Sequence, residues 1–327
     1  MYMRRDNEQS AGRRQKVEVL QFMQEKITRL EDGGKKSTAH NYSSALNSFR
    51  RFLCGKIVYA DGVDGKLMTA YEHWLQEEKP GGKKLGENSS SFYLRHLRTI
   101  WHEMVAAGMA DRGNEDPFKN VFTGVKKTAK RAVPEASITR LEKAVTRLSP
   151  NLAFALSMFL FSYYTRGMSF VDLAHLKKTD IQGGVLTYTR SKTGKVLHIE
   201  LLPEMIMIIR RYAADVKDSP YLFPILNANG EGYESALRLQ NKRLNRISLI
   251  LELNVKLTTH VARHSWATVA RDKGVDIETI CDALGHSSIL VTRIYLAELN
   301  SSVINKANRI VLKRKQEPKI KRYESAG

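Results

Sequence analysis

The densest group of side chains that could do chemistry lies within Leu257–Leu299. His260 and Arg263 stand three residues apart, so on a helix both project from one face near its N-terminal end, where the helix dipole favours a phosphate. His286 follows Arg263 by twenty-three residues, directly after a helix-ending glycine, and Tyr295 follows nine residues later. A loop histidine and a tyrosine on the next helix can converge on one ligand. The segment therefore predicts a phosphate pocket with a phenol beside it.

The net charge of the chain points to a polyanionic partner. The 327 residues include 53 lysines and arginines against 34 aspartates and glutamates, which gives a formal net charge of +19. Because 42% of the residues are hydrophobic, this surplus belongs to a folded protein, with length enough for about two domains. Nucleic acid is the commonest partner for such an excess, and an anionic membrane is the second.

Export, membrane insertion and metal binding are disfavoured by the same sequence. The first sixteen residues are charged, but no apolar stretch follows them, so they do not form a secretory signal. The most apolar segment, Leu152–Tyr164, is too short to span a membrane, and we expect a helix buried in a core. Cys54 and Cys281 lie far apart and form neither a disulfide framework nor a zinc pair. We expect a cytoplasmic, nucleoid-associated protein with no membrane partner, metal or other cofactor.

Apolar residues recur with helical spacing through the first part of the chain, and a short helix near Leu67–Leu75 completes a small bundle. The three longer faces are Leu20, Met23, Ile27 and Leu30; Tyr42, Leu46, Phe49 and Leu53; and Leu94, Leu97, Trp101 and Met104. Cations on the polar sides of these helices fit a DNA-binding face, although a charge run is also typical of a solvated surface. These candidate DNA-binding residues are Lys35, Lys36, Arg50, Arg51, Arg95 and Arg98.

A basic linker follows, with the sequence KKTAKRAVPEAS at 126–137 and no apolar periodicity. Its cations suit a segment that lies along a phosphate backbone, although an ordinary solvated linker has much the same composition. The residues concerned are Lys126, Lys127, Lys130 and Arg131.

The second part combines helices with one small sheet. After a helix that opens at Ser137 and the buried helix already noted, the apolar period changes to that of strands at 185–190 and 196–201, joined by the turn sequence KTGK. Helical patterns return at 205–212, 235–251, 260–273 and 277–284. The predicted fold class is mainly α, of the α+β kind: a small helical N-terminal bundle and a mostly helical second domain with a β-hairpin.

These patterns predict five segments. Residues 1–12 form a flexible N-terminus, 13–125 a helical core DNA-binding domain, 126–136 the basic linker, 137–300 a catalytic domain and 301–327 a basic tail. Seven lysines and arginines stand against two glutamates from Arg309 onward, so the tail is either a flexible arm or a segment that docks on a neighbour.

The HxxR sequence, LGHSS and the tyrosine nine residues after that histidine resemble the signature of tyrosine recombinases, the phage integrase family. The hairpin that begins at RSKTG resembles the one that bears the catalytic lysine of this family, which implies Lys192. The likeness covers the whole second domain, and the first domain is similar in size, helix content and position to a core-binding domain. It implies catalytic roles for Tyr295, Arg263, His260 and His286.

One position departs from the family pattern. The family places an arginine three residues before an acidic residue, and here Ser169 stands three residues before Asp172. Arg166 lies one turn earlier, so on a helix it shares a face with Ser169 and could reach the same phosphate; Arg190 is another candidate. Asp172 would support the cations. The pattern RGMSFVDLAHL resembles integrases of Bacteroides-type bacteria.

The resemblance implies that the tyrosine attacks a DNA phosphodiester, giving a 3′-phosphotyrosyl link and a free 5′-hydroxyl, and that the reverse reaction rejoins strands. Neither ATP nor a metal is needed if Arg263 and Arg166 neutralise the phosphoryl oxygens. Lys192 would protonate the leaving oxygen, His260 would accept the tyrosine proton, and His286 would hydrogen-bond the phosphate.

Other functions and outcomes remain open at this stage. A helix-turn-helix regulator would explain the charge but not Tyr295; a type IB topoisomerase uses the same nucleophile, and a magnesium nuclease lacks paired carboxylates here. The expected partners are double-stranded DNA recombination sites, a homotetramer on DNA with exchanged C-terminal tails, and an accessory DNA-bending protein. Integration, excision, inversion and resolution are not distinguished, although the short first domain favours inversion or resolution.

Overall fold

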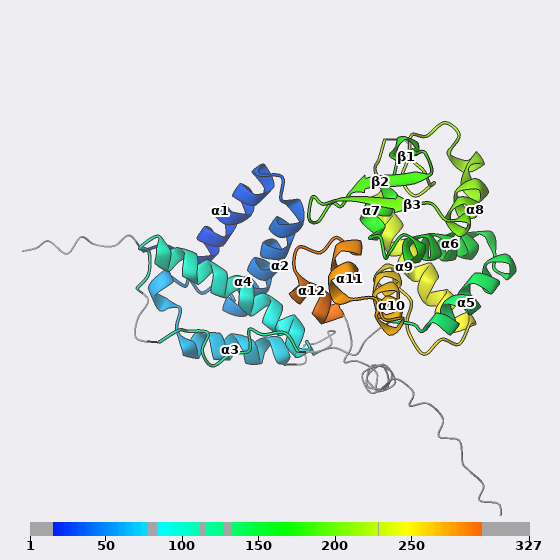
Figure 1. The fold of residues 1–327 in the computed structure, drawn as a ribbon. Helices are drawn as coiled ribbons and strands as arrows, with labels where there is room; N and C mark the ends of the chain where they lie inside the picture. Colours follow the sequence, from blue (N-terminus) through cyan, green and yellow to red (C-terminus); the bar gives the residue numbers. More distant parts are fainter. Residues whose placement is uncertain (1–15, 78–83, 112–114, 127–131, 228, 296–327) are drawn as a thin grey trace, which may run out of the picture. The chain divides into compact units, whose positions relative to one another are not determined.

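The computed structural model describes residues 16–77, 84–111, 115–126, 132–227 and 229–295, and for 294 and 295 it describes the backbone alone. The chain divides into two compact units, Met1–Thr128 and Ala129–Gly327. Each unit is considered by itself below, with the element labels of Figure 1.

The first unit is a helical bundle, as the apolar spacing predicted. Its helices are α1 (Val19–Asp32), α2 (Lys36–Leu53), α3 (Gly65–Gln76) and α4 (Glu87–Ala106), with a short 3₁₀ turn, η1 (Ala60–Gly62), before α3. The predicted faces pack into one core around Phe49, Tyr71 and Trp101, all of which are buried. The Tyr71 hydroxyl donates to Ser48 Oγ at 2.8 Å, so this buried hydroxyl has a partner.

The second unit is mostly helical around a small antiparallel sheet, which confirms the predicted fold class. Its longer helices are α5 (Glu135–Ala144), α6 (Pro150–Tyr164), α8 (Pro203–Tyr212), α9 (Tyr233–Ile250) and α10 (Thr259–Asp272). Shorter ones are α7 (Phe170–Ala174), α11 (Ile277–Ala283) and α12 (Ile289–Tyr295), with 3₁₀ turns η2 (Val145–Arg147), η3 (Lys178–Asp180) and η4 (Ala214–Val216). Figure 1 shows the sheet on one side of the unit and α10 beside α11.

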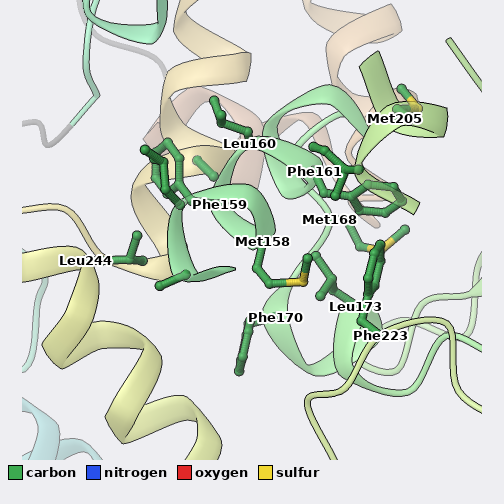
Figure 2. Close-up of a cluster of buried hydrophobic side chains, with 14 of the residues drawn as sticks. Met158, Phe159, Leu160, Phe161, Met168, Phe170, Leu173, Met205, Phe223 and Leu244 are labelled. Atoms are coloured by element: carbon green, nitrogen blue, oxygen red, sulfur yellow. The ribbon is translucent and has the colours of Figure 1, made fainter. Parts of the chain in front are cut away.

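Helix α6 is the centre of the second core. Its sequence is apolar on all sides, and every residue from Ala155 to Ser162 is buried. Figure 2 shows how Phe159, Leu160 and Phe161 of α6 point in different directions and meet side chains of other elements. The segment is therefore a core helix, as its length predicted, and no helix among the described residues is long and apolar enough to cross a bilayer.

The sheet has the order β1-β2-β3, with neighbouring strands antiparallel. Strands β2 (Val185–Thr189) and β3 (Val196–Glu200) form the predicted hairpin, and their buried residues pair as Leu186 with Ile199 and Tyr188 with Leu197. Strand β1 (Ile181–Gln182) was not predicted, because two residues are too few to show a period of two. The hairpin projects the turn 190–195 toward α11, where the candidate site lies.

Candidate active site

Helix α10 carries His260 and Arg263, and its N-terminal end is the centre of the site. Arg263 is only 3% exposed. Its Nη1 donates to the Gly167 carbonyl at 2.8 Å, and its Nη2 donates to the Leu284 carbonyl. Because the two carbonyls come from different parts of the chain, the guanidinium is fixed between the α6–α7 turn and the end of α11.

The α6–α7 turn is packed directly on α10. Gly167 adopts a left-handed conformation with φ +73°, and a Cβ on it would lie 2.6 Å from Arg263 Cα. Glycine is therefore required here for space as well as for backbone conformation. The next residue along the chain toward the N-terminus, Arg166, is partly buried and also left-handed, with φ +60°.

The prediction that Arg166 and Ser169 share a helix face is wrong. Helix α6 ends at Tyr164, and the left-handed residues at 166 and 167 reverse the chain before α7 begins at Phe170. Arg166 thus belongs to the turn, and Ser169 is the N-cap of α7. The turn still keeps Arg166 beside the site, because the residue that follows it contacts Arg263.

The Asp172 side chain is buried and accepts hydrogen bonds from Ser169, the N-cap of α7, and from Ser191 of the β2–β3 turn. Its Oδ2 accepts from the Ser169 hydroxyl at 2.6 Å. Its Oδ1 accepts from the Ser191 backbone N–H at 2.9 Å and from the Ser191 hydroxyl. The carboxylate therefore ties α7 to the β2–β3 turn at the residue directly before Lys192.

The other side of the β2–β3 turn is held by the carbonyl of Gly285. Thr193 Oγ1 donates to this oxygen at 3.1 Å, and Arg190 Nη1 donates to it as well. Lys192 itself is exposed. The two neighbours of Lys192 are thus hydrogen-bonded to α7 on one side and to the α11–α12 loop on the other, so the turn presents the lysine from a fixed base.

The charges of three arginines and one carboxylate act on the hydroxyl of Tyr188, a buried residue of β2. The pKa of Tyr188 is raised to about 12, chiefly by burial and next by the charge of Asp172, while Arg263, Arg190 and Arg166 act in the opposite direction. Their combined influence on one hydroxyl places the three cations in one neighbourhood. A buried phenol with a raised pKa is a poor nucleophile, so its surroundings do not favour Tyr188 as the attacking group.

His286 is buried, with 6% of its surface exposed, and its Nδ1 lies 2.8 Å from Thr292 Oγ1 of α12. The pKa of His286 is lowered to about 3, chiefly by burial and next by the charges of Arg263, Arg190 and Lys192. The ring is therefore neutral near pH 7, and one of its two nitrogens can donate a hydrogen bond. An open hollow of about 590 Å³ borders His286, but Arg263, His260 and Lys192 are not among its lining residues.

His260, like Lys192, is exposed. Its pKa is lowered because neighbouring protein atoms displace water from the ring, and because Arg263 and Lys192 are close and positive. A neutral imidazole can accept a proton, so the direction of this pKa shift suits a general base. The charge of Lys192 acts on both His260 and His286, so the lysine lies near both histidines.

Tyr295 is the last residue of α12, nine residues after His286 and in the helix that contacts it through Thr292. The side chain of Tyr295 lies outside the described part of the structure. The predicted contributions of Lys127, Lys130, Arg131, the N-terminus 1–12 and the tail 301–327 also fall outside the described residues.

The candidate DNA-binding cations of the first unit are surface residues of α2 and α4. Those with exposed side chains are Lys35, Lys36, Arg50, Arg51, Arg95 and Lys126. Arg98 is different, because it forms an ion pair with Asp116 at 3.5 Å and donates to Thr123 Oγ1 at 3.2 Å. These contacts of Arg98 connect α4 to the loop that follows it.

Lys126 also has partners within the first unit. Its Nζ lies 2.5 Å from Glu87 Oε1, and its backbone N–H and carbonyl are both bound by the Asn88 side chain, at 2.7 and 2.9 Å. The basic linker therefore begins from an anchored residue. In the second unit the Val133 N–H donates to Ser265 Oγ of α10 at 2.9 Å, two residues after Arg263.

Sequence reasoning missed several residues of the site. Arg190 was named only as a substitute cation, yet it is 6% exposed and bound to Gly285; a basic residue that ends a strand beside the candidate lysine was the available signal. Thr193 and Thr292 carried no signal, because a hydroxyl in a turn or helix has no distinctive spacing. Among the described residues no group of histidine, cysteine, aspartate and glutamate is arranged to hold a metal ion.

Two family models together match most of the chain. The model described as the phage integrase SAM-like domain matches residues 18–123, and the model described as the phage integrase family matches residues 131–301. The second match alone spans more than half of the chain and includes every candidate catalytic residue. The chain belongs to the phage integrase family. It is a site-specific tyrosine recombinase that acts on DNA by strand cleavage and rejoining, so the non-catalytic regulator considered above is excluded.

Relatives and solved structures of this family resemble the recombinase over most of its length. Tyrosine recombinase XerA of Pyrococcus furiosus is 29% identical over 266 residues, 77% of this chain and 89% of the relative. An integrase of the Tn1549 transposon in complex with DNA has a TM-score of 0.68 at 16% identity and covers 89% of this chain and 99% of its own. A lambda integrase tetramer bound to a Holliday junction has a TM-score of 0.65 at 18% identity, covering 86% and 78%.

Proposed function

We propose that this recombinase cleaves DNA through Tyr295, whose phenolic oxygen attacks a backbone phosphorus and forms a 3′-phosphotyrosyl link. The leaving 5′-oxygen takes a proton from Lys192, and the phenol gives its proton to His260. The observation that carries this proposal is the assembly around Arg263 of α10, whose buried guanidinium binds the α6–α7 turn and the end of α11. The β2–β3 turn binds the Gly285 carbonyl, directly after the residue at the end of α11 that Arg263 reaches.

The phosphate is held by groups that are already fixed before it arrives. Arg263 is bound to two backbone carbonyls, and the buried His286 ring is held by Thr292. Preorganised donors of this kind stabilise developing negative charge without reorganisation during the reaction. Rejoining is the same step in reverse with another 5′-hydroxyl as nucleophile, so bond energy is conserved and the proposal uses neither ATP nor a metal.

The second clamp on the phosphate comes from Arg166 or Arg190. Arg166 stands in the turn that contacts Arg263, and Arg190 is buried, bound to the Gly285 carbonyl directly before His286. Both charges reach the neighbourhood of Tyr188. Burial and the contact next to His286 favour Arg190, whereas Arg166 retains more freedom to reach a substrate. Asp172 supports the site by holding Ser191, and Ser169 completes that network in place of the family arginine.

The proposal extends to the assembly and the subgroup. We assign 13–125 to core DNA binding, 137–300 to catalysis and 301–327 to a tail exchanged between neighbours in a homotetramer on DNA recombination sites. The lambda integrase tetramer on a Holliday junction supports this assembly by likeness of fold. An accessory DNA-bending protein, a cytoplasmic nucleoid location and membership of a Bacteroides-type subgroup, suggested by RGMSFVDLAHL, belong to the same proposal.

Covalent capture tests the nucleophile and the need for metal together. The full chain is incubated with a pool of nicked duplexes of random sequence, with and without EDTA, then denatured, and the DNA retained on the protein is sequenced. We expect a covalent complex in both conditions, enriched for one site. Tyr295→Phe should abolish it while DNA binding persists. Capture that survives in Tyr295→Phe, or that disappears with EDTA, contradicts the proposal.

A further inference from the structure

The contact between His286 and Thr292 joins the phosphate pocket to the helix of the proposed nucleophile. Nδ1 of His286 and Oγ1 of Thr292 are 2.8 Å apart, and the two side chains are 6% and 0% exposed. Thr292 stands three residues before the end of α12, on the face of that helix that includes position 295. The contact is therefore short and buried, and it connects the proposed phosphate-binding histidine with the helix of the proposed nucleophile.

The direction of this hydrogen bond follows from the burial of the hydroxyl. A buried O–H that lacks an acceptor costs free energy. Within the described residues the structure gives Thr292 Oγ1 a bond to His286 Nδ1 and none to a backbone carbonyl of α12. If Nδ1 carried the ring proton, it would donate to the Thr292 oxygen, and the buried threonine hydrogen would be left without an acceptor among these hydrogen bonds. Because an unsatisfied buried hydrogen costs free energy, the arrangement in which the threonine donates and Nδ1 accepts is favoured.

We propose that Thr292 is a positioning residue that fixes the tautomer of His286, so that the ring N–H is on Nε2 and can be donated to a phosphoryl oxygen. This inference rests on the proposed function, because a phosphate oxygen accepts hydrogen bonds and does not donate them. A neutral ring has one N–H, so donation from Nε2 is possible only while Nδ1 accepts.

The same contact makes the tautomer depend on the position of α12. When the helix is docked, Thr292 supplies its hydrogen to Nδ1 and His286 presents Nε2–H. When the helix leaves, Nδ1 loses this donor, and the ring can adopt the other tautomer. The Nε2–H tautomer of His286 is thereby coupled to the docking of α12, the helix that ends at Tyr295.

The direct test is nitrogen NMR of the full chain labelled with ¹⁵N-histidine, in which the shifts of the two ring nitrogens show which one is protonated. The His286 signals are assigned by their loss in His286→Gln. We expect Nε2–H in the wild type and in Thr292→Ser, and a mixture of tautomers in Thr292→Val, which keeps the shape but lacks the hydroxyl. A wild-type ring with the proton on Nδ1 overturns the proposal, as does an unchanged tautomer in Thr292→Val.

The kinetic test uses single-turnover covalent capture on the duplex selected above. We expect Thr292→Val to slow cleavage about tenfold, the effect of losing about one oriented hydrogen bond, with DNA affinity unchanged and with Thr292→Ser close to the wild type. Equal rates for Thr292→Val and the wild type contradict the proposal. Thr292→Ala is the second variant if valine disturbs the packing of α12.

Thr268→Val is the matched control. Thr268 lies on α10, and its Oγ1 is buried with no hydrogen-bond partner among the described residues. The same substitution at this position therefore removes no hydrogen bond. We expect it to leave both the tautomer and the rate unchanged, and a slowing equal to that of Thr292→Val would assign the effect to packing and overturn the proposal. Absence of any covalent complex in the wild type would refute the proposed function, while the NMR result would still decide the role of Thr292.

Discussion

The cations of the two units differ in how they are held. In the second unit Arg263 and Arg190 are 3% and 6% exposed and donate to backbone carbonyls. In the first unit Arg50 and Arg51, in the last turn of α2, are exposed, and the Arg50 side chain contacts Asn47 of the same helix. The same residue type is thus immobilised in one unit and solvated in the other.

This difference separates two ways in which arginine can act on DNA. A buried, fixed guanidinium stabilises charge that develops in a transition state, so its effect is on the rate of cleavage. An exposed guanidinium contributes to affinity by displacing counterions from phosphates, so its effect is on binding and changes with salt. The four predictions below test this division, in order of decreasing expected effect.

Arg263→Lys tests the fixed guanidinium most directly. Lysine keeps the charge but cannot bond to the Gly167 and Leu284 carbonyls as a planar fork, so we expect cleavage to slow by about 10²–10³-fold, the usual cost of losing a preorganised donor. Single-turnover covalent capture at saturating protein measures the rate, and a filter-binding titration measures affinity. A variant that loses affinity but cleaves normally once bound would remove the distinction between the two units.

Gly167→Ala tests the packing that fixes Arg263. The added methyl would meet Arg263 Cα at 2.6 Å in a left-handed backbone, so we expect the second unit to lose about 1–3 kcal/mol of stability and cleavage to slow with it. Gly183→Ala is the matched control, because Gly183 also has a positive φ, +57°, but has nothing within 4 Å of the added atom. Urea unfolding of the full chain measures the free energy of unfolding of both variants. Equal losses of stability in Gly167→Ala and Gly183→Ala would show that backbone strain alone accounts for the effect.

Thr193→Val tests whether the base of the β2–β3 turn is needed for Lys192. The hydroxyl bond to the Gly285 carbonyl is lost, while the shape of the side chain is kept. We expect cleavage to slow about fivefold to tenfold, within the range for one hydrogen bond, and Thr193→Ser to restore it. A substrate with a better leaving group than the 5′-hydroxyl should reduce the defect, because it needs proton donation less. A defect of the same size on both substrates would assign Thr193 to a different task.

Arg51→Ala tests the solvated cations and has the smallest expected effect. We expect affinity to fall only a few-fold and the slope of log affinity against log salt to decrease by about 1 if one phosphate contact is lost. The cleavage rate at saturating protein should not change. DNA binding is titrated at four salt concentrations. Lys119→Ala is the control for the loss of one positive charge from the first unit, because Lys119 is exposed and is not among the candidate DNA-binding residues. A slower cleavage step in Arg51→Ala would contradict the division between the units.

Local periodicity was sufficient for most of the fold. Apolar spacing located the helices of both units, and the KTGK turn located the hairpin, because each of these signals lies within a few residues of the element it describes. The error at Arg166 has a physical origin. A pattern of three-residue steps was extended through 166–169, whereas the glycine at 167 allowed the chain to reverse there.

The site was less accessible to sequence reasoning than the fold. His260, Arg263 and His286 could be named from their types and spacing, and Lys192 from the family resemblance; their roles stay predictions. Their supports could not be named, because the Gly285 carbonyl, which binds Thr193 and Arg190, is a backbone atom that every residue has. Which carbonyl a side chain reaches is decided by tertiary packing.

The Gly183–Gly184 turn between β1 and β2 has a practical use. Both glycines have a positive φ and open space around them, at the opposite end of strand β2 from the Lys192 turn. A fluorophore or a short affinity tag attached there would report on single protein molecules during strand exchange without entering the chemistry.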